Sequence, residues 1–128
     1  MTTANFFKCP VCGNVAYQAT EGGGTMICCG QPMEELVPNS TDANPETHKP
    51  VLSIKDDVLY IRVGEKDHPM TTEHGIRWVA VTAPGIVAFK HLDPTGEPVA
   101  QFGIADAAPE SVVAYCNKHG LWETPIEL

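Results

Sequence analysis

The chain has 128 residues, and its 16 acidic side chains outnumber its 8 lysines and arginines, for a formal charge of -8. This balance argues against nucleic acid or an anionic membrane as a partner and favours a basic redox partner. No apolar run approaches the roughly 18 residues of a transmembrane helix, and the first residues lack a signal-peptide pattern, so we expect a cytoplasmic protein. Five cysteines, an odd number, favour metal-bound thiolates over a closed set of disulfides.

The first 37 residues contain two pairs of cysteines. Cys9 and Cys12 are separated by fifteen residues from the adjacent pair Cys28 and Cys29. We predict a module over residues 1–37 with a tetrahedral four-sulfur metal site. Its geometry should be distorted, because neighbouring side chains of an extended segment point to opposite sides. A structural zinc ribbon and a single iron fit this spacing equally well, and a disulfide between the adjacent cysteines is a third option.

A change of pattern separates this module from the rest of the chain. The polar segment 38–46 is rich in turn-forming residues and predicts a linker. Beyond it, over residues 47–128, short runs of valine, isoleucine and aromatic residues alternate with turn signals. The expected strands are 51–54, 58–63, 76–82, 86–91, 99–104, 112–115 and 121–123. This spacing predicts an antiparallel β-sandwich of immunoglobulin type and no substantial helix, so the whole chain is expected to be mainly β.

Five possible metal donors lie in or next to the loops of the second domain. They are His48, His68, His74, Cys116 and His119. The loops of a sandwich gather at its two ends, so donors that are distant in the sequence can meet at one rim. Zinc is usually satisfied by four ligands, whereas four imidazoles and one thiolate suit a five-coordinate iron with a vacant position. Each histidine taken alone also fits a solvated surface position, which is the interpretation we give to His91.

The combined pattern resembles desulfoferrodoxin, the two-iron class of superoxide reductase, over essentially the whole chain. The matching motifs are Cys9-x-x-Cys12, Cys28-Cys29, His48, His68-x5-His74 and Cys116-x-x-His119. The first module is similar to desulforedoxin, whose iron centre is rubredoxin-like, and the second to neelaredoxin, the one-iron form of the enzyme. The resemblance implies two irons, a homodimer, and one-electron reduction of superoxide to hydrogen peroxide, which detoxifies superoxide in an anaerobe or microaerophile.

The resemblance also implies a role for each site residue. The four N-terminal cysteines would bind the first iron, an electron relay or store that is supplied by a small donor such as rubredoxin. The second iron would take the four histidines in its equatorial plane and Cys116 as its axial ligand. Glu46 matches a family glutamate that can occupy the sixth position. Thr47 stands where the family has a lysine that draws in superoxide, and Lys49, or else Lys118, is the expected substitute.

The donor set itself suits this chemistry. Four neutral imidazoles leave the charge of the metal largely intact, so it attracts a small anion. A thiolate opposite the vacancy donates electron density and stabilises ferric iron, and nearby backbone N–H groups can moderate that donation. Three other functions remain open: a zinc ribbon before an immunoglobulin-like binding domain, an electron carrier whose irons are closed to small ligands, and a dismutase that also oxidises superoxide.

Overall fold

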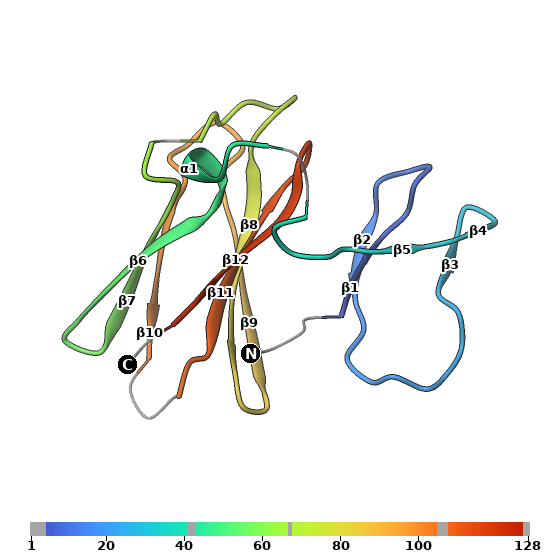
Figure 1. Cartoon of the computed structure of the whole chain (residues 1–128), viewed down its shortest axis with the longest axis horizontal. Helices are drawn as coiled ribbons and strands as arrows, with labels where there is room; N and C mark the ends of the chain where they lie inside the picture. The colour runs from blue at the N-terminus through green and yellow to red at the C-terminus, as the bar shows by residue number, and fades with distance from the viewer. Residues whose placement is uncertain (1–4, 41–42, 67, 105–107, 127–128) are drawn as a thin grey trace. The chain divides into compact units, whose positions relative to one another are not determined.

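The computed structural model describes residues 5–40, 43–66, 68–104 and 108–126. The chain divides into two compact units, of which one runs from Thr3 to Val37 and the other begins at Pro38 (Figure 1). Both units are built from antiparallel strands, so the predicted mainly β fold is confirmed. Within the described ranges, no helix has the length and apolar character that are needed to cross a membrane.

The first unit contains two small sheets. One has the order β2-β1-β5, with β1 at Phe6–Lys8, β2 at Val15–Tyr17 and β5 at Glu34–Glu35. The other is a hairpin of β3 (Ile27–Cys28) and β4 (Gln31–Pro32). Phe6 is fully buried, and its ring centroid lies 5.2 Å from that of Tyr17. A unit this short buries little apolar surface, so a bound metal is the natural source of additional stability.

The hairpin of the first unit turns through Cys29 and Gly30. Their φ angles are +54° and +73°, and two successive positive angles are typical of a tight hairpin turn. Glycine adopts this conformation freely, whereas a residue with a Cβ does so at a cost. The turn interrupts the extended alternation that would send Cys28 and Cys29 to opposite sides. The backbone kink that adjacent cysteines require is therefore supplied by the hairpin turn itself.

The second unit is a sandwich of two antiparallel sheets. The smaller sheet has the order β10-β7-β6, with β6 at Pro50–Lys55, β7 at Val58–Val63 and β10 at Val99–Gly103. The larger has the order β12-β11-β8-β9, with β8 at Ile76–Ala83, β9 at Ile86–His91, β11 at Ser111–Cys116 and β12 at Gly120–Pro125. These seven strands are the seven that the sequence predicts, with ends that differ by a residue or two.

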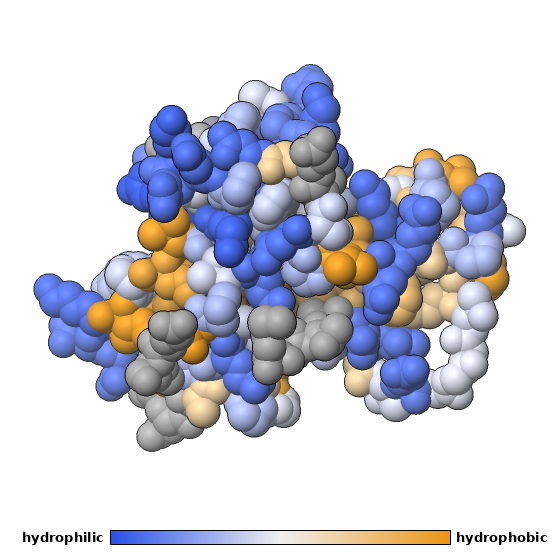
Figure 2. Space-filling model, in the orientation of Figure 1, coloured by the Kyte–Doolittle hydropathy of each residue, from blue (hydrophilic) through white to orange (hydrophobic). Residues whose placement is uncertain are grey.

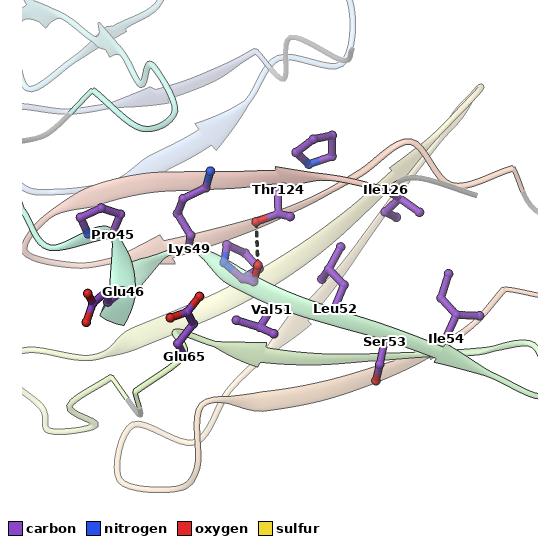
Figure 3. Close-up of a pocket in the computed structure, with 12 residues that line it drawn as sticks. Pro45, Glu46, Lys49, Val51, Leu52, Ser53, Ile54, Glu65, Thr124 and Ile126 are labelled. Atoms are coloured by element: carbon purple, nitrogen blue, oxygen red, sulfur yellow. Dashed lines mark hydrogen bonds between the residues drawn. The ribbon is translucent and has the colours of Figure 1, made fainter.

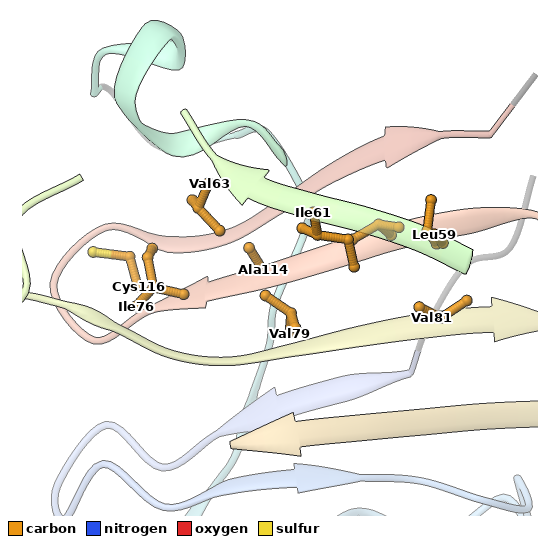
Figure 4. Packing of buried hydrophobic residues seen from close by; sticks show 9 residues of the cluster. Leu59, Ile61, Val63, Ile76, Val79, Val81, Ala114 and Cys116 are labelled. Atoms are coloured by element: carbon orange, nitrogen blue, oxygen red, sulfur yellow. The ribbon is translucent and has the colours of Figure 1, made fainter. Parts of the chain in front are cut away.

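The core of the sandwich lies between its two sheets (Figure 4). Alternate residues of β7, namely Leu59, Ile61 and Val63, face Val79 and other small aliphatic side chains of the larger sheet. Cys116 belongs to the same cluster, at the end of β11. The visible face of the molecule is largely hydrophilic, with apolar patches (Figure 2). The packed core thus ends at a buried sulfur, next to the loops that carry the histidines.

A single helical turn, α1 (Pro45–His48), falls partly inside the predicted linker. The side chain of Asn44 caps it by accepting a hydrogen bond from the Glu46 amide at 2.9 Å, and Pro45 fixes the backbone of the first turn. Earlier in the same segment, the Asn39 side chain exchanges two hydrogen bonds with the backbone of Glu123 on β12. Parts of the polar segment are therefore ordered against the sandwich, and α1 brings His48 to its place.

Candidate metal centres

The four cysteine sulfurs of the first unit converge. All four lie within 4.8 Å of one another, and Cys12 Sγ is 3.7 Å from Cys28 Sγ. Tetrahedral metal–sulfur bonds of about 2.3 Å put the sulfurs roughly 3.8 Å apart, which matches this spacing. The sulfurs of Cys28 and Cys29 are 4.0 Å apart and all five cysteines are free, so the disulfide between the adjacent pair is not formed. The arrangement has the size of a four-sulfur metal site.

The pKa values of these thiols also favour a bound cation. The amides of Cys12 and Val11 both lie 3.4 Å from Cys9 Sγ, and their hydrogen bonds lower the pKa of Cys9 to about 6. Hydrogen bonding among the crowded thiols, with Cys12 as the strongest contributor, raises the pKa of Cys29 to about 12. Four sulfurs this close cannot all be thiolates at neutral pH unless a cation compensates their charge.

The second centre is a ring of four imidazoles at one end of the sandwich. His48 ends α1, His68 and His74 lie in the connection between β7 and β8, and His119 lies in the turn between β11 and β12. Neighbouring rings around the circle are nearly perpendicular, with interplanar angles of 80° to 83°, whereas the opposed rings of His48 and His74 are tilted by only 29°. This is the arrangement of four equatorial ligands around one point.

The distances between the ring nitrogens have the size of a metal site. His48 Nε2 lies 3.0 Å from His68 Nε2 and 3.0 Å from His119 Nδ1. Adjacent ligands with metal–nitrogen bonds of about 2.1 Å are roughly 3.0 Å apart when they subtend a right angle. The donor atoms of His48, His68, His74 and Cys116 all lie within 4.8 Å of one another. The Nε2 of His74 is buried without a hydrogen-bond partner among the described residues, as expected of a nitrogen that serves as a metal ligand.

Two of the rings are fixed by backbone carbonyls. His48 Nδ1 lies 2.8 Å from the carbonyl oxygen of Asn44, and His68 Nδ1 lies 2.7 Å from that of Pro69. A carbonyl accepts only from a protonated nitrogen, so each Nε2 carries a lone pair. Burial lowers the pKa of His68 to about 4 and also lowers that of His48, which keeps both rings neutral at neutral pH. Lone pairs 3.0 Å apart repel each other unless a cation lies between them.

Cys116 provides a buried sulfur for the same centre. Its thiol is fully buried, and burial raises its pKa, while the amides of Lys118 and His119 oppose that shift. The amide of His119 lies 3.4 Å from Cys116 Sγ. The ladder between β11 and β8 shifts register at Cys116, because Tyr115 pairs with Trp78 but Cys116 pairs with Ile76. This irregularity redirects the end of the strand next to the histidines.

The charged residues expected at this centre lie on the surface. Glu46 is exposed on α1 and forms an ion pair with Lys66, whose Nζ is 3.5 Å from a carboxylate oxygen. Lys49 is exposed directly after α1, and Lys118 is exposed in the turn between β11 and β12. Glu46 and Lys49 also line a surface pocket that extends along β6 to the end of β12 (Figure 3). His91 is exposed at the end of β9, outside both clusters.

Several supporting residues are not predicted by the sequence analysis. The ring centroid of Trp122 lies 5.0 Å from that of His48, and the Trp122 indole N–H donates to the His119 carbonyl at 3.3 Å. Asn44 and Pro69 act through backbone oxygens, which no residue type signals. The only available signal was Asn44-Pro45-Glu46, which is typical of the start of a helix.

Comparisons with known proteins agree with this arrangement. A family model described as "Desulfoferrodoxin" matches residues 40–125, and one described as "Desulfoferrodoxin, N-terminal domain" matches residues 2–36. A desulfoferrodoxin homolog from Methanothermobacter thermautotrophicus is 43% identical over 123 residues, which cover 95% of this chain and 99% of the relative. The crystal structure of the superoxide reductase from Treponema pallidum is similar with a TM-score of 0.79 and 27% identity, over 96% of this chain and 99% of that one. The superoxide reductase (1Fe-SOR) from Giardia intestinalis is similar with a TM-score of 0.57 and 30% identity, over 65% of this chain and 99% of that one.

Proposed function

Because the chain belongs to the desulfoferrodoxin family, we propose that it is a superoxide reductase, which reduces superoxide to hydrogen peroxide and so detoxifies it in an anaerobe or microaerophile. The observation that carries this proposal is the ring of four imidazoles beside the buried sulfur of Cys116. A structural zinc ribbon accounts for the first centre alone and leaves this ring without a purpose. A donor set of four nitrogens and one sulfur leaves one position of an octahedron for a small anion.

The residues present fit one iron at each centre. Cys9, Cys12, Cys28 and Cys29 would hold the first, and His48, His68, His74, His119 and Cys116 would hold the second. When bound, the second iron supplies the electron that reduces superoxide. The buried histidines remain neutral, so they supply ligand nitrogens without repelling the cation. The amide that contacts Cys116 Sγ moderates the electron donation of the thiolate.

We assign residues 1–37 to the four-cysteine module, 38–46 to a linker, and 47–128 to the catalytic domain. The division of the chain at Val37 and the match of the N-terminal family model to residues 2–36 support the first boundary, whereas the second compact unit begins at Pro38 and its family model at residue 40, so the linker belongs to the catalytic unit. The first iron would act as an electron relay or store for the second.

Glu46 and Lys49 are proposed to act at the rim of the second centre. Lys49 would supply positive charge for the approach of superoxide, and Glu46 would occupy the open position of the oxidised centre when no substrate is bound. The family resemblance motivates both roles, and the positions of Glu46 within α1 and Lys49 directly after it, on either side of His48, support them. Replacing Glu46 by Ala should shift the visible absorption of the oxidised second centre, whereas Glu65→Ala, at the rim of the same pocket, should leave it unchanged. An unshifted spectrum for the Glu46 variant would remove the proposed role.

The cellular setting is proposed on chemical grounds. Five cysteines that all serve as metal donors are typical of a reducing compartment, which favours the cytoplasm. A small electron donor such as rubredoxin would reduce the protein, and a homodimer would increase the burial of the small first unit. Sedimentation velocity of the metal-loaded protein tests the dimer directly, since a single species of monomer mass at micromolar concentration would contradict it.

Product stoichiometry tests the proposed reaction. The purified protein, whose iron content should be two ions per chain, is pre-reduced and mixed with a pulse of superoxide. A superoxide reductase forms one hydrogen peroxide for each superoxide consumed and releases no oxygen. A dismutase releases one oxygen for each peroxide formed. Oxygen release at that ratio, or zinc in place of iron at the second centre, would overturn the proposed function.

A further inference from the structure

His74 is held differently from the two buried histidines beside it. The rings of His48 and His68 are oriented by carbonyls 2.8 Å and 2.7 Å from Nδ1. Among the described residues, the His74 ring has no such hydrogen bond, and its buried Nε2 is unpartnered. Since the ring itself is not tethered, the direction of His74 depends on the backbone that carries it.

The local turn around His74 does not connect it to the other donors. The amide of His74 donates to Thr71 Oγ1 at 3.0 Å, and the carbonyl of His74 accepts from both the amide and the hydroxyl of Thr71, at 3.0 Å and 3.1 Å. These bonds all lie within residues 71–74. They fix the shape of the loop, but another contact must fix its distance from Cys116.

Asn117 provides that contact from the residue directly after Cys116. Its side-chain oxygen accepts from the Gly75 amide at 2.9 Å, and its side-chain nitrogen donates to the Glu73 carbonyl at 3.2 Å. Its own amide donates to the Gly75 carbonyl at 3.2 Å. The three bonds hold the chain on both sides of His74.

We propose that Asn117 is a positioning residue that ties His74 to the turn carrying Cys116 and His119. This inference uses one part of the proposed function, namely that His74, Cys116 and His119 bind the same metal ion. An amide side chain is required because one end must accept from an N–H and the other must donate to a carbonyl. Alanine offers neither group, and aspartate keeps the acceptor but faces the Glu73 carbonyl with a negative charge. Asn117 itself does not touch the ion or the substrate.

Cobalt(II) affinity tests the proposal without depending on superoxide turnover. Metal-free full-length chain is titrated with cobalt(II) in the presence of a competing chelator. The visible bands of a four-thiolate site and of a site with imidazoles and one thiolate differ, so the two centres are followed separately in each sample. Asn117→Ala should weaken cobalt binding at the second centre about tenfold or more, as the loss of an orienting partner does in other metal sites, and leave the first centre unchanged.

Asn39→Ala is a matched control. Asn39 also makes two side-chain hydrogen bonds to backbone groups, at 3.0 Å and 3.2 Å to Glu123, but it contacts no donor. Its φ of +60° makes alanine strained there, so this variant should be at least as destabilised as Asn117→Ala. If cobalt affinity at the second centre falls equally in both variants, the effect is general destabilisation and the proposal is wrong.

Amide exchange and a conservative variant complete the test. In the metal-loaded chain, the peptide that contains residues 71–77 should exchange faster in Asn117→Ala than in the parent protein, because the Gly75 amide loses its acceptor. Asn117→Asp keeps that acceptor and should show intermediate cobalt affinity, which also provides a result should the alanine variant not fold. The proposal is wrong if the aspartate variant binds cobalt as tightly as the parent protein and the alanine variant either does the same or does not fold. Absence of superoxide reduction in the parent protein would instead concern only the proposed function.

Discussion

At the scale of single residues, burial of His68 has a consequence for stability. Burial lowers the pKa of this histidine in the folded chain to about 4, from 6.5 for an exposed side chain. Between these values the unfolded chain binds more protons than the folded chain, so the free energy of unfolding decreases as the pH falls. This contribution is complete above pH 6.5 and is lost progressively down to about pH 4. The denaturation midpoint of the metal-free protein should therefore fall through this range.

Two variants isolate the histidine from the carboxylates, which also titrate in acid. His68→Gln should reduce the slope of the midpoint between pH 6.5 and 5. His91→Gln, which replaces an exposed histidine of the same unit, should leave the slope unchanged. A slope that is the same in all three proteins would mean that His68 is not the source.

Lys49 provides a second prediction at this scale. If its charge draws superoxide towards the second centre, Lys49→Ala should lower the second-order rate several-fold at low ionic strength and flatten the dependence of that rate on salt. Lys55→Ala is the matched control, because Lys55 is exposed at the far end of β6, the strand that begins directly after Lys49. The rate is measured after a superoxide pulse across a range of salt concentrations. Lys118→Ala is measured alongside, since the pKa of His74 is lowered mainly by burial but also by the charge of Lys118.

The residue scale also shows what a sequence can and cannot predict about the site. Histidines and cysteines are few and chemically distinctive, so the candidate donors could be selected and their convergence at one rim expected. The partners that orient them could not, because the carbonyls of Asn44 and Pro69 are present in every residue. The role of the Asn117 side chain could not be predicted either, because its two hydrogen bonds depend on a loop that lies more than 40 residues away in the chain.

At the scale of elements, the sandwich brings its loops together by close backbone approaches. Gly64 follows β7 with a φ of +91°, and its amide donates to the Lys49 carbonyl at 3.0 Å. A Cβ at this position would lie 2.7 Å from the Thr47 carbonyl oxygen and would also collide with that of Lys66. The glycine thus allows the end of β7 to pass beside the turn that carries His48. No larger residue fits there without moving that turn.

Gly64→Ala should therefore destabilise the protein strongly. We expect a loss of about 2 kcal/mol or more in the free energy of unfolding, because backbone strain and a collision with rigid carbonyls add together. Gly85→Ala, in the turn between β8 and β9, has a φ of +73° but open space around it, and should lose only about 1 kcal/mol. Denaturant unfolding measures both. Equal losses would show that the close approach at Gly64 relaxes without cost.

The strands were predictable because each has a clear pattern of its own. Alternation of apolar and polar residues in β7 and the valine-rich run of β11 identify strands without reference to the rest of the fold. The two-residue strands β4 and β5 of the first unit have no such pattern and depend on their partners. The turn α1 was missed because a single helical turn is too short for apolar periodicity.

At the scale of the whole molecule, each of the two units carries its own cluster of donors. Cys12→Ser should therefore abolish the first iron centre without changing the iron content or spectrum of the second. If the first iron is an electron relay, this variant should be reduced more slowly by a small donor such as rubredoxin, yet react with superoxide at the normal rate once it is chemically reduced. Rapid mixing measures both steps. Unchanged reduction by the donor would contradict the relay.

The second centre draws its donors from the connections of both sheets of the sandwich. His48 precedes β6 and His68 follows β7 of one sheet, while His74 precedes β8 and Cys116 ends β11 of the other. An ion bound to these donors would link the two sheets at this end of the sandwich, where the apolar contacts that join them elsewhere stop. Loss of this ion would therefore remove a link between the two sheets together with the catalytic centre, so one event would cost both activity and stability.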